Sequence, residues 1–401
     1  MALSTLEQKL VGLVAARETE LREDLARWVA IPTGGGHTKG LDAYRQIVTG
    51  RLSALGAMVR LEPGDQRPDW LNDSPNSDAE STPPPTAVCV AEGDGPRIML
   101  CGHLDTVHDP AGPFDRLTIE PGGQRARGPG AADMKGGILV AVAALEALHA
   151  AGVRPAWTFA LNSDEETGSY CSDRVLRQVA AGCSVGLVFE PALPDGSLVV
   201  ERPGSGQFVL EAFGRAAHVG RDFSAGVNAI GAIASRVLEI SAKADPAAGR
   251  IVNVGVIRGG VATNVVPERA SAWGNARFSS AEAERELAEA IDALATSTEA
   301  MPRVSVKRSF ARPAKPMTPG VERLAMLARR AAEDLGQSLP FGKTGGVCDG
   351  NNMQAAGIPV IDTLGVRGGG LHTSEEWIEL PSLVQRAQLA AVLMHRLSSG
   401  A

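Results

Sequence analysis

Two histidines and five acidic residues of this chain are of the types that bind transition metals, and most of them follow an apolar run directly. They occur in five short motifs: His103 and Asp105 in GHLDTV, Asp133 in GPGAADMKGG, Glu165 and Glu166 in DEETGS, Glu190 in FEP, and His372 in LHTSEEW. In open α/β sheets, residues at the carboxyl ends of strands face the edge where ligands bind. Imidazoles combined with carboxylates favour zinc, manganese or cobalt over calcium, which prefers oxygen alone. The set therefore predicts a hydrolase with two metal ions.

His103 and Asp105 form an H-x-D pair at the end of an expected strand. One ring nitrogen of His103 would bind metal, and Asp105 would accept a hydrogen bond from the other, which fixes the tautomer. The alternative is a surface histidine beside a capping aspartate. Asp133 precedes an expected helix and could be a simple N-cap. The glycines on both sides of it instead indicate an unusual backbone, and one carboxylate can bridge two metals.

Glu165 and Glu166 are adjacent and would form a solvated acidic turn in most sequences. Here they follow an apolar strand, so they can divide the work. One binds metal, and the other takes a proton from a water molecule that the metal activates. Glu190 could be an exposed strand end and His372 a structural loop histidine. The combination and order of all these residues nevertheless favour a metal site.

The elements that must position these residues show two patterns. Apolar strands expected at 86–91, 97–102, 157–161 and 185–189 alternate with helices at 134–150 and 171–181, which predicts a parallel sheet covered on both faces. Between 207 and 310 the order becomes β-α-β-β-α-β, the ferredoxin-like arrangement. We therefore expect a catalytic domain in two parts, 1–206 and 316–401, with an inserted domain at 207–315. The polar, proline-rich segment 65–86 should be a surface loop.

The composition limits the class of protein. With 401 residues, 44% hydrophobic and 21% charged, the chain should be globular, and its net charge of −7 argues against nucleic acid or an anionic membrane as a partner. Five widely spaced cysteines without a C-x-x-C pair indicate reduced thiols in the cytoplasm. The amino-terminal segment is typical of an amphipathic helix, not of a secretory signal. No run approaches about 18 apolar residues, so we expect no membrane span.

Taken together, the five motifs resemble the co-catalytic di-zinc exopeptidases and deacylases, which include glutamate carboxypeptidase, acetylornithine deacetylase, succinyl-diaminopimelate desuccinylase, aminoacylase and peptidase T. The resemblance covers about residues 90–380. It implies a zinc-exopeptidase-like α/β catalytic domain with a mostly parallel central sheet, and a ferredoxin-like α+β insert that serves as lid and dimerisation domain. A GGVCDGNN stretch around Asp349 resembles the glutamate carboxypeptidase branch.

The resemblance also implies a role for each residue of the centre. Asp133 would bridge both ions, with His103 and Glu190 completing one site and Glu166 and His372 the other. Glu165 would be the general base and later the proton donor, and Asp105 would orient His103. The peptide bond after the bridging aspartate, Asp133–Met134, would be cis.

Four residues of the insert resemble substrate-contacting positions of the family. His218 in GRAAHVG would donate a hydrogen bond to the developing oxyanion, and in dimeric relatives it comes from the partner subunit. Asn264 and Arg277 match positions that hold the α-carboxylate, to which the planar fork of arginine is suited. The family often has Asp where Asn275 stands. Arg312 resembles a position that could read a second carboxylate, although a solvated surface arginine is the alternative.

We therefore expect a cytoplasmic, metal-dependent amidohydrolase that removes an amino acid or an acyl group from a small substrate with a free α-carboxylate. Glutamate carboxypeptidase is the nearest type, and N-acyl amino acid deacylase and dipeptidase remain open. Two zinc ions are expected per chain, with cobalt or manganese as alternatives, and the insert should form a homodimer or close over its own site through hinges near 205–206 and 314–315. A catalytically silent, metal-stabilised binding protein is the rival class. Glu165 argues against it, since a binding site needs no base beside its ligand.

Overall fold

Strand β3 (Asp94–His103) shows how the apolar runs build the central sheet. The computed structural model describes residues 2–72 and 82–400. Successive side chains of a strand point to opposite faces, so Ile98 and Leu100 enter one hydrophobic core while Met99 and Cys101 enter another. Because both faces are buried from residue 98 onward, the segment 98–102 is apolar throughout instead of alternating with polar residues.

The central sheet has six strands in the order β1-β2-β6-β3-β7-β16. Strands β6, β3, β7 and β16 are mutually parallel, while β2 is antiparallel to both of its neighbours. Helices α5 and α11 pack against the same face, and α6 and α10 belong to the core on the other. The prediction of a mostly parallel, two-sided sheet is confirmed. The strand bounds are β1 Met58–Glu62, β2 Thr86–Ala91, β6 Pro155–Asn162, β7 Val185–Val188 and β16 Val360–Ile361. The helices of this body are α1 Thr5–Ala15, α2 Glu18–Val29, α3 Thr38–Ala54, α4 Asp69–Asn72, α5 Gly137–Ala151, α6 Asp173–Ala181, α9 Pro319–Asp334, α10 Asp349–Ala355 and α11 Leu380–Ser398.

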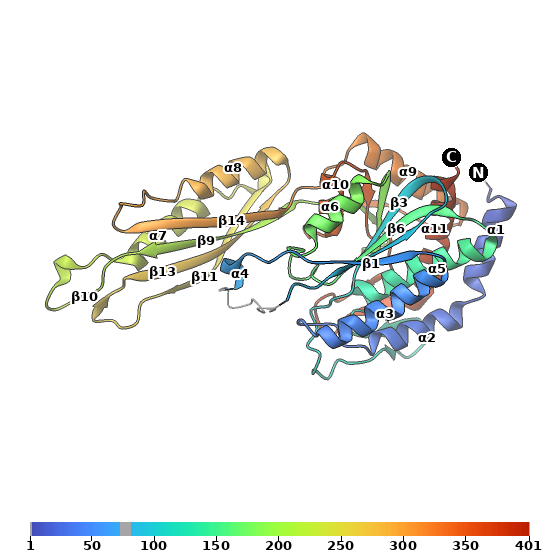
Figure 1. The fold of residues 1–401 in the computed structure, drawn as a ribbon, viewed down its shortest axis with the longest axis horizontal. Coiled ribbons are helices and arrows are strands. Elements are labelled where there is room, and N and C mark those ends of the chain that lie inside the picture. The colour runs from blue at the N-terminus through green and yellow to red at the C-terminus, as the bar shows by residue number, and fades with distance from the viewer. Residues whose placement is uncertain (1, 73–81, 401) are drawn as a thin grey trace.

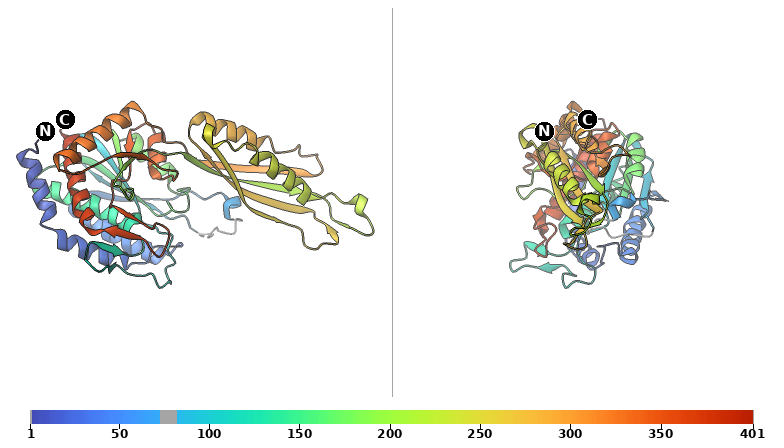
Figure 2. Two further views of the ribbon diagram at one scale, coloured as in Figure 1. Left: turned by 180° about the vertical axis from the view of Figure 1, so that it is seen from behind. Right: turned by 90° about the vertical axis from the view of Figure 1, so that its left-hand side faces the viewer.

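A second, antiparallel sheet has the order β11-β13-β9-β14. Along the chain its elements follow as β9-α7-β11-β13-α8-β14, which is the expected β-α-β-β-α-β arrangement, and the two helices lie against the sheet (Figure 2). We refer to residues 204–312 as the inserted unit. It extends away from the six-stranded sheet, with the short strand β10 at its far end (Figure 1). Its bounds are β9 Gly204–Phe213, β10 Ala217–His218, α7 Ala229–Ser241, β11 Arg250–Gly259, β12 Val265–Val266, β13 Arg269–Phe278, α8 Ala281–Asp292 and β14 Arg303–Arg312.

Several elements differ from the sequence-based expectation. One amino-terminal helix was expected, but two are present, α1 and α2. The expected loop at 65–86 contains α4, and its residues 73–81 lie outside the described residues. Helix α10 and two small sheets were not predicted. These sheets are β17-β18-β5-β4 and β15-β8, with bounds β4 Thr118–Ile119, β5 Arg125–Arg127, β8 Leu198–Glu201, β15 Phe341–Lys343, β17 Gly368–Gly369 and β18 Trp377–Glu379.

One segment, Ala131–Ala151, is long and apolar enough to cross a membrane by length and composition, although the sequence analysis singled out no such run. Its most apolar stretch is 78% buried inside the protein. Helix α5, which makes up most of it, packs against α11, α1 and β3. The apolar composition therefore serves the core of the fold.

Candidate metal centre and active site

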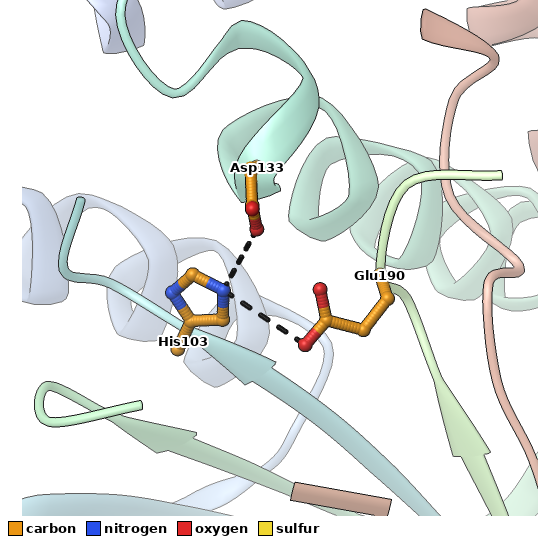
Figure 3. A group of neighbouring side chains, drawn as sticks. All are labelled: His103, Asp133 and Glu190. Carbon is orange, nitrogen blue, oxygen red and sulfur yellow. Dashed lines mark hydrogen bonds and ion pairs between the residues drawn. The ribbon is translucent and has the colours of Figure 1, made fainter. Parts of the chain in front are cut away.

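His103 is the last residue of β3, and its ring lies between Asp133 and Glu190 (Figure 3). The Nε2 atom is 3.1 Å from Asp133 Oδ1 and 3.9 Å from Glu190 Oε1. Asp133 comes from the distorted helical turn before α5, and Glu190 lies two residues beyond β7. Three residues that are far apart in the sequence thus place their ligand atoms within 4.8 Å of one another.

A second group consists of Asp133, Glu166 and His372. His372 Nε2 lies 3.4 Å from Asp133 Oδ2 and 3.2 Å from Glu166 Oε2. The two oxygens of Asp133 therefore face different histidines, which is the geometry of a carboxylate that bridges two cations. Glu166 Oε1 is buried and has no hydrogen-bond partner among the described residues. A buried carboxylate oxygen without a partner is costly unless a cation binds it, so these donors fit two divalent ions.

The backbone at both ends of this arrangement is unusual. The Asp133–Met134 peptide bond is cis, as the resemblance implies, and the backbone at Asp133 is not helical (φ −115°, ψ 92°). His372 has a φ of 62°, a region that residues other than glycine rarely adopt. A positive φ at a residue such as His372 persists only where surrounding contacts enforce it, and such residues cluster at functional sites.

Glu376 supports the turn that carries Asp133. Its carboxylate, 1% exposed, accepts hydrogen bonds from the backbone N–H groups of Gly130 (3.1 Å), Ala132 (2.7 Å) and Asp133 (3.0 Å). It also lies 2.6 Å from Nε2 of His108. The sequence analysis missed this residue, although it belongs to the LHTSEEW motif. A glutamate four residues after an expected metal ligand was the available signal.

Burial and neighbouring charges strongly shift the pKa values of the residues in this centre. Burial raises the pKa values of Glu190 and Glu166. Burial acts in the same direction on Asp133, but hydrogen bonds with His103 and His372 outweigh it and hold the pKa of Asp133 below its usual value. Hydrogen bonds with Asp133 and Glu166 raise the pKa of His372 to about 10. Since a metal needs neutral imidazoles and ionised carboxylates, cation binding at this cluster should release protons.

Glu165 lies beside the ligand set but is held by different contacts. Burial raises its pKa to about 8, and Arg312 opposes that shift because its Nη2 lies 2.8 Å from Glu165 Oε1. Asp105 accepts hydrogen bonds from the backbone N–H groups of Glu165 (3.3 Å) and Glu166 (3.0 Å). His103 Nδ1 is nearer to the backbone carbonyl oxygen of Asp105 (3.0 Å) than to its carboxylate (3.4 Å). Asp105 thus contacts both the histidine and the DEETGS turn.

The structure separates the four insert residues into two pairs. His218 and Asn264 lie together, since His218 pairs with Val265 and the Val219 N–H donates to the Asn264 carbonyl at 3.0 Å. Strand β10, which carries His218, is at the far end of the inserted unit, remote from the metal ligands (Figure 1). Asn264 therefore lies at a different end of the inserted unit from Arg277, and their shared role at the α-carboxylate stays a prediction.

Arg277 and Arg312 lie at the other end of the inserted unit, where both pair with Ser205. They line a cavity of about 310 Å³ together with Glu165, Glu166 and His372. Arg277 Nε donates to Asn275 Oδ1 at 3.0 Å, so Asn275 still orients this arginine, and its Nη1 is buried without a partner among the described residues. Arg312 is 6% exposed, so the alternative of a solvated surface arginine is wrong.

Residues 99–396 match the model of Peptidase family M20/M25/M40. The chain belongs to this family. An M20 protein of this kind is a metallohydrolase, and the prediction of a metal-dependent hydrolase of amide or peptide bonds is confirmed.

Three relatives illustrate the range of the M20 family. Carboxypeptidase G2 of Pseudomonas sp. (strain RS-16) is 28% identical over 94% of this chain and 89% of its own length. Succinyl-diaminopimelate desuccinylase of Rhodospirillum centenum is 27% identical over 95% of this chain and 97% of its own. The solved Bacillus subtilis YXEP protein, a dinuclear metal-binding M20 peptidase, is 16% identical with a TM-score of 0.67 and covers 96% of this chain and 100% of its own. This last likeness shows the shared fold.

Proposed function

We propose that the chain is a carboxypeptidase of the glutamate carboxypeptidase type, which hydrolyses the amide bond next to an amino acid with a free α-carboxylate. One observation carries the proposal. A single cavity is lined by Glu165, by the candidate metal ligands Glu166 and His372, and by Arg277, whose guanidinium has a buried nitrogen without a partner among the described residues. A substrate whose carboxylate binds Arg277 would present its amide bond to the centre.

Each residue of the centre then has a distinct task. Asp133 would hold both ions, His103 and Glu190 one of them, and Glu166 and His372 the other. Zinc ions bound there would act as Lewis acids and would make water a better nucleophile at neutral pH. Glu165 would take the proton of the attacking water and deliver it to the leaving nitrogen, a task suited to its raised pKa of about 8. Asp105 would hold His103 and the DEETGS turn in their positions relative to each other.

The oxyanion contact belongs, in this proposal, to a partner subunit. His218 and Asn264 lie at the far end of the inserted unit from their own metal ligands, so a second chain would have to supply them. Exposed apolar side chains on α7 (Ile230 and Leu238) and on the edge strand β11 (Ile251 and Ile257) offer a pairing surface. A cytoplasmic homodimer formed through the inserted domain, with domain limits 1–206, 207–315 and 316–401, would complete the site.

An N-acyl amino acid deacylase or a dipeptidase would use the same centre and the same carboxylate contact. These activities differ only in the group on the acyl side of the amide. The desuccinylase likeness over nearly the whole chain favours keeping the deacylase as the second candidate. A silent binding protein would have no use for Glu165 beside Glu166.

The proposal is tested by loading the protein with zinc, cobalt or manganese and assaying acyl-glutamates, acyl-ornithines and dipeptides. We expect up to two ions per chain by elemental analysis, release of an amino acid with a free carboxylate, and loss of activity with a chelator. The matched amides that lack the free carboxylate are the control substrates and should be poor. Equal rates on both sets would contradict the role of Arg277, and full activity in the metal-free protein would end the proposal.

A further inference from the structure

Arg312, the last residue of β14, makes two contacts with Glu165 and a third with Ser169. Its Nη2 atom lies 2.8 Å from Glu165 Oε1 and donates to the Glu165 backbone carbonyl at 2.7 Å and to Ser169 Oγ at 2.6 Å. A guanidinium that binds the carboxylate and the backbone of the same residue fixes that side chain relative to its own main chain. Arg312 therefore holds the Glu165 side chain and its backbone carbonyl through one nitrogen atom.

The charge of Arg312 is already balanced by protein groups. Glu165 and Asp349 are 8% and 1% exposed, and Asp349 Oδ1 lies 3.9 Å from Arg312 Nη2. Asp349 also accepts hydrogen bonds from Ser169 Oγ (2.5 Å) and Asn162 Nδ2 (2.9 Å). Ser169 has a φ of 54°, a strained value that these contacts maintain. Two buried carboxylates therefore compete with any substrate carboxylate for Arg312, although its Nε, like Arg277 Nη1, is buried without a partner among the described residues.

The main chain that carries Arg312 is fixed to the catalytic body. Asn351, in the GGVCDGNN stretch, donates from Nδ2 to the carbonyls of Pro203 (2.9 Å) and Pro313 (2.8 Å), one on each connection to the inserted unit. The next residue, Asn352, donates to the carbonyl of Ala311 at 3.0 Å. These bonds hold the backbone on both sides of Arg312, so its guanidinium is placed by the junction between the two bodies.

From these contacts we propose that Arg312 is a positioning residue, which holds Glu165 in line with the metal centre from the last strand of the inserted unit. The inference rests on the proposed role of Glu165 as the base. It replaces the expectation that Arg312 reads a second carboxylate of the substrate. A residue that only positions the base affects turnover, whereas one that binds substrate affects KM.

The test compares four variants of the zinc-loaded protein. Arg312→Ala should lower kcat by about 10²-fold, the cost of a reacting group displaced by about 1 Å, with KM and metal content unchanged. Arg312→Lys keeps the positive charge and should lower kcat less than Arg312→Ala does. It also controls for misfolding of the alanine variant. Arg277→Ala should instead raise KM by about 10–100-fold, the loss of a charged hydrogen bond. Arg308→Ala is the matched control, since Arg308 lies on the same strand, forms its ion pair with exposed Asp292 and contacts the ring of Phe310; it should leave both constants unchanged.

Two further measurements separate positioning from a general structural role. Guanidinium ion should restore part of the kcat of Arg312→Ala and none of that of Glu165→Gln. In a Glu165→Asp background, Arg312→Ala should lower kcat far less than in the wild type, because the shorter aspartate side chain no longer reaches the arginine. A rise in KM at unchanged kcat, or an equal loss in both backgrounds, would overturn the inference while leaving the proposed hydrolase intact.

A crystal structure of the zinc-loaded Arg312→Ala protein decides the question without any turnover. The Glu165 carboxylate should leave its wild-type place while both ions and Glu166 remain. If Glu165 stays in place, the inference is overturned even if no substrate is found. If the wild type is inactive on every substrate but Glu165 moves, the proposed function fails and the positioning role stands.

Discussion

Two adjacent glutamates in this chain have entirely different surroundings. Glu166 faces His372 and Asp133, whereas Glu165 faces Arg312. Because consecutive residues in the turn direct their side chains to different partners, one can bind a cation while the other stays free to exchange a proton. The division of labour expected from the sequence thus has a geometric basis.

Substitution of each glutamate should therefore give a different defect. Glu165→Gln should keep two ions per chain but lose turnover by about 10²–10⁴-fold, the usual contribution of a general base. Glu166→Gln is its matched control. This variant should retain fewer ions per chain than Glu165→Gln, as measured by elemental analysis after dialysis. Wild-type turnover in Glu165→Gln would remove this residue from the mechanism.

Glu376 should control how tightly the centre holds its ions, although it is not a ligand. Glu376→Gln weakens the support of the turn at Gly130–Asp133, since a neutral amide accepts those N–H groups less strongly. Outer partners of this kind typically change metal affinity by about 10–100-fold. Competition with a fluorescent zinc chelator measures the change. The neighbouring Glu375→Gln is the control because Glu375 is exposed and pairs with Arg127; equal affinities of the two variants would contradict the role.

At the scale of elements, the two chain segments that enter and leave the inserted unit meet at one buried ion cluster. Arg202 and Lys315 exchange backbone hydrogen bonds of 3.0 Å, and their side chains lie 2.8 Å and 3.2 Å from the carboxylate of Asp362. Both Lys315 and Asp362 are fully buried. These contacts fix the backbone at Lys315, within the hinge expected near 314–315. Bending of the inserted unit would therefore have to occur nearer to β14, where the strand pairing is irregular between Ser309 and Arg312.

Loss of Asp362 should destabilise the protein in a pH-dependent way. Burial acts to raise the pKa of Asp362, but Arg202 and Lys315 outweigh it, so the folded pKa lies below the usual value. The cluster therefore stabilises the fold above the unfolded pKa of about 3.9, and that contribution is lost as the pH falls through the folded pKa. Asp362→Asn should lower the free energy of unfolding at pH 7 by about 3–5 kcal/mol.

Urea unfolding at several pH values measures this effect. The difference between wild type and Asp362→Asn should persist from pH 7 to pH 5 and narrow only in strong acid. Asp292→Asn removes a carboxylate from the exposed pair with Arg308 and should change the stability by no more than about 0.5 kcal/mol. A difference that is the same at pH 3 and pH 7 would show that Asp362 acts without its charge.

The sequence predicts elements well where local pattern and tertiary environment agree. The apolar strands β3 and β6 and the helix α5 were predictable because burial on all sides leaves a continuous apolar run. Helix α10 was missed because it is short and holds Asp349, Gly350 and two asparagines, which indicate a loop by composition. Its polar residues are buried because they bond the strands of the junction, a contact that no local pattern reveals. Glu376 was missed for the same reason, since the turn that it supports lies about 240 residues earlier.

At the scale of the whole molecule, the sequence indicated which insert residues resemble substrate contacts but not where they lie. The placement of His218 depends on the direction in which β9 leaves the junction and on the length of the inserted unit. These properties place His218 far from its own metal ligands (Figure 1). The proposal that a second chain completes the site therefore rests on the shape of the molecule, which residue spacing does not reveal.

Two inactive variants should therefore complement each other. His218→Ala and Glu165→Gln homodimers each lack one part at both sites. In a mixed dimer, the metal centre with intact Glu165 receives His218 from the partner, so one of the two sites is complete. Mixing the variants under conditions that exchange subunits should recover activity. No recovery despite subunit exchange shown by native mass spectrometry would mean that His218 acts within its own chain or not at all.

The mutual backbone bonds of Arg202 and Lys315 mark a point at which the chain can be shortened. They are the closing pair of a hairpin whose loop is the whole of residues 203–314, so an Asn-Gly turn could join the two ends directly. The shortened chain would keep His103, Asp133, Glu166, Glu190 and His372 while losing Arg277, Arg312, Asn264 and His218. Ion retention and choice of substrate would then be separable by one deletion.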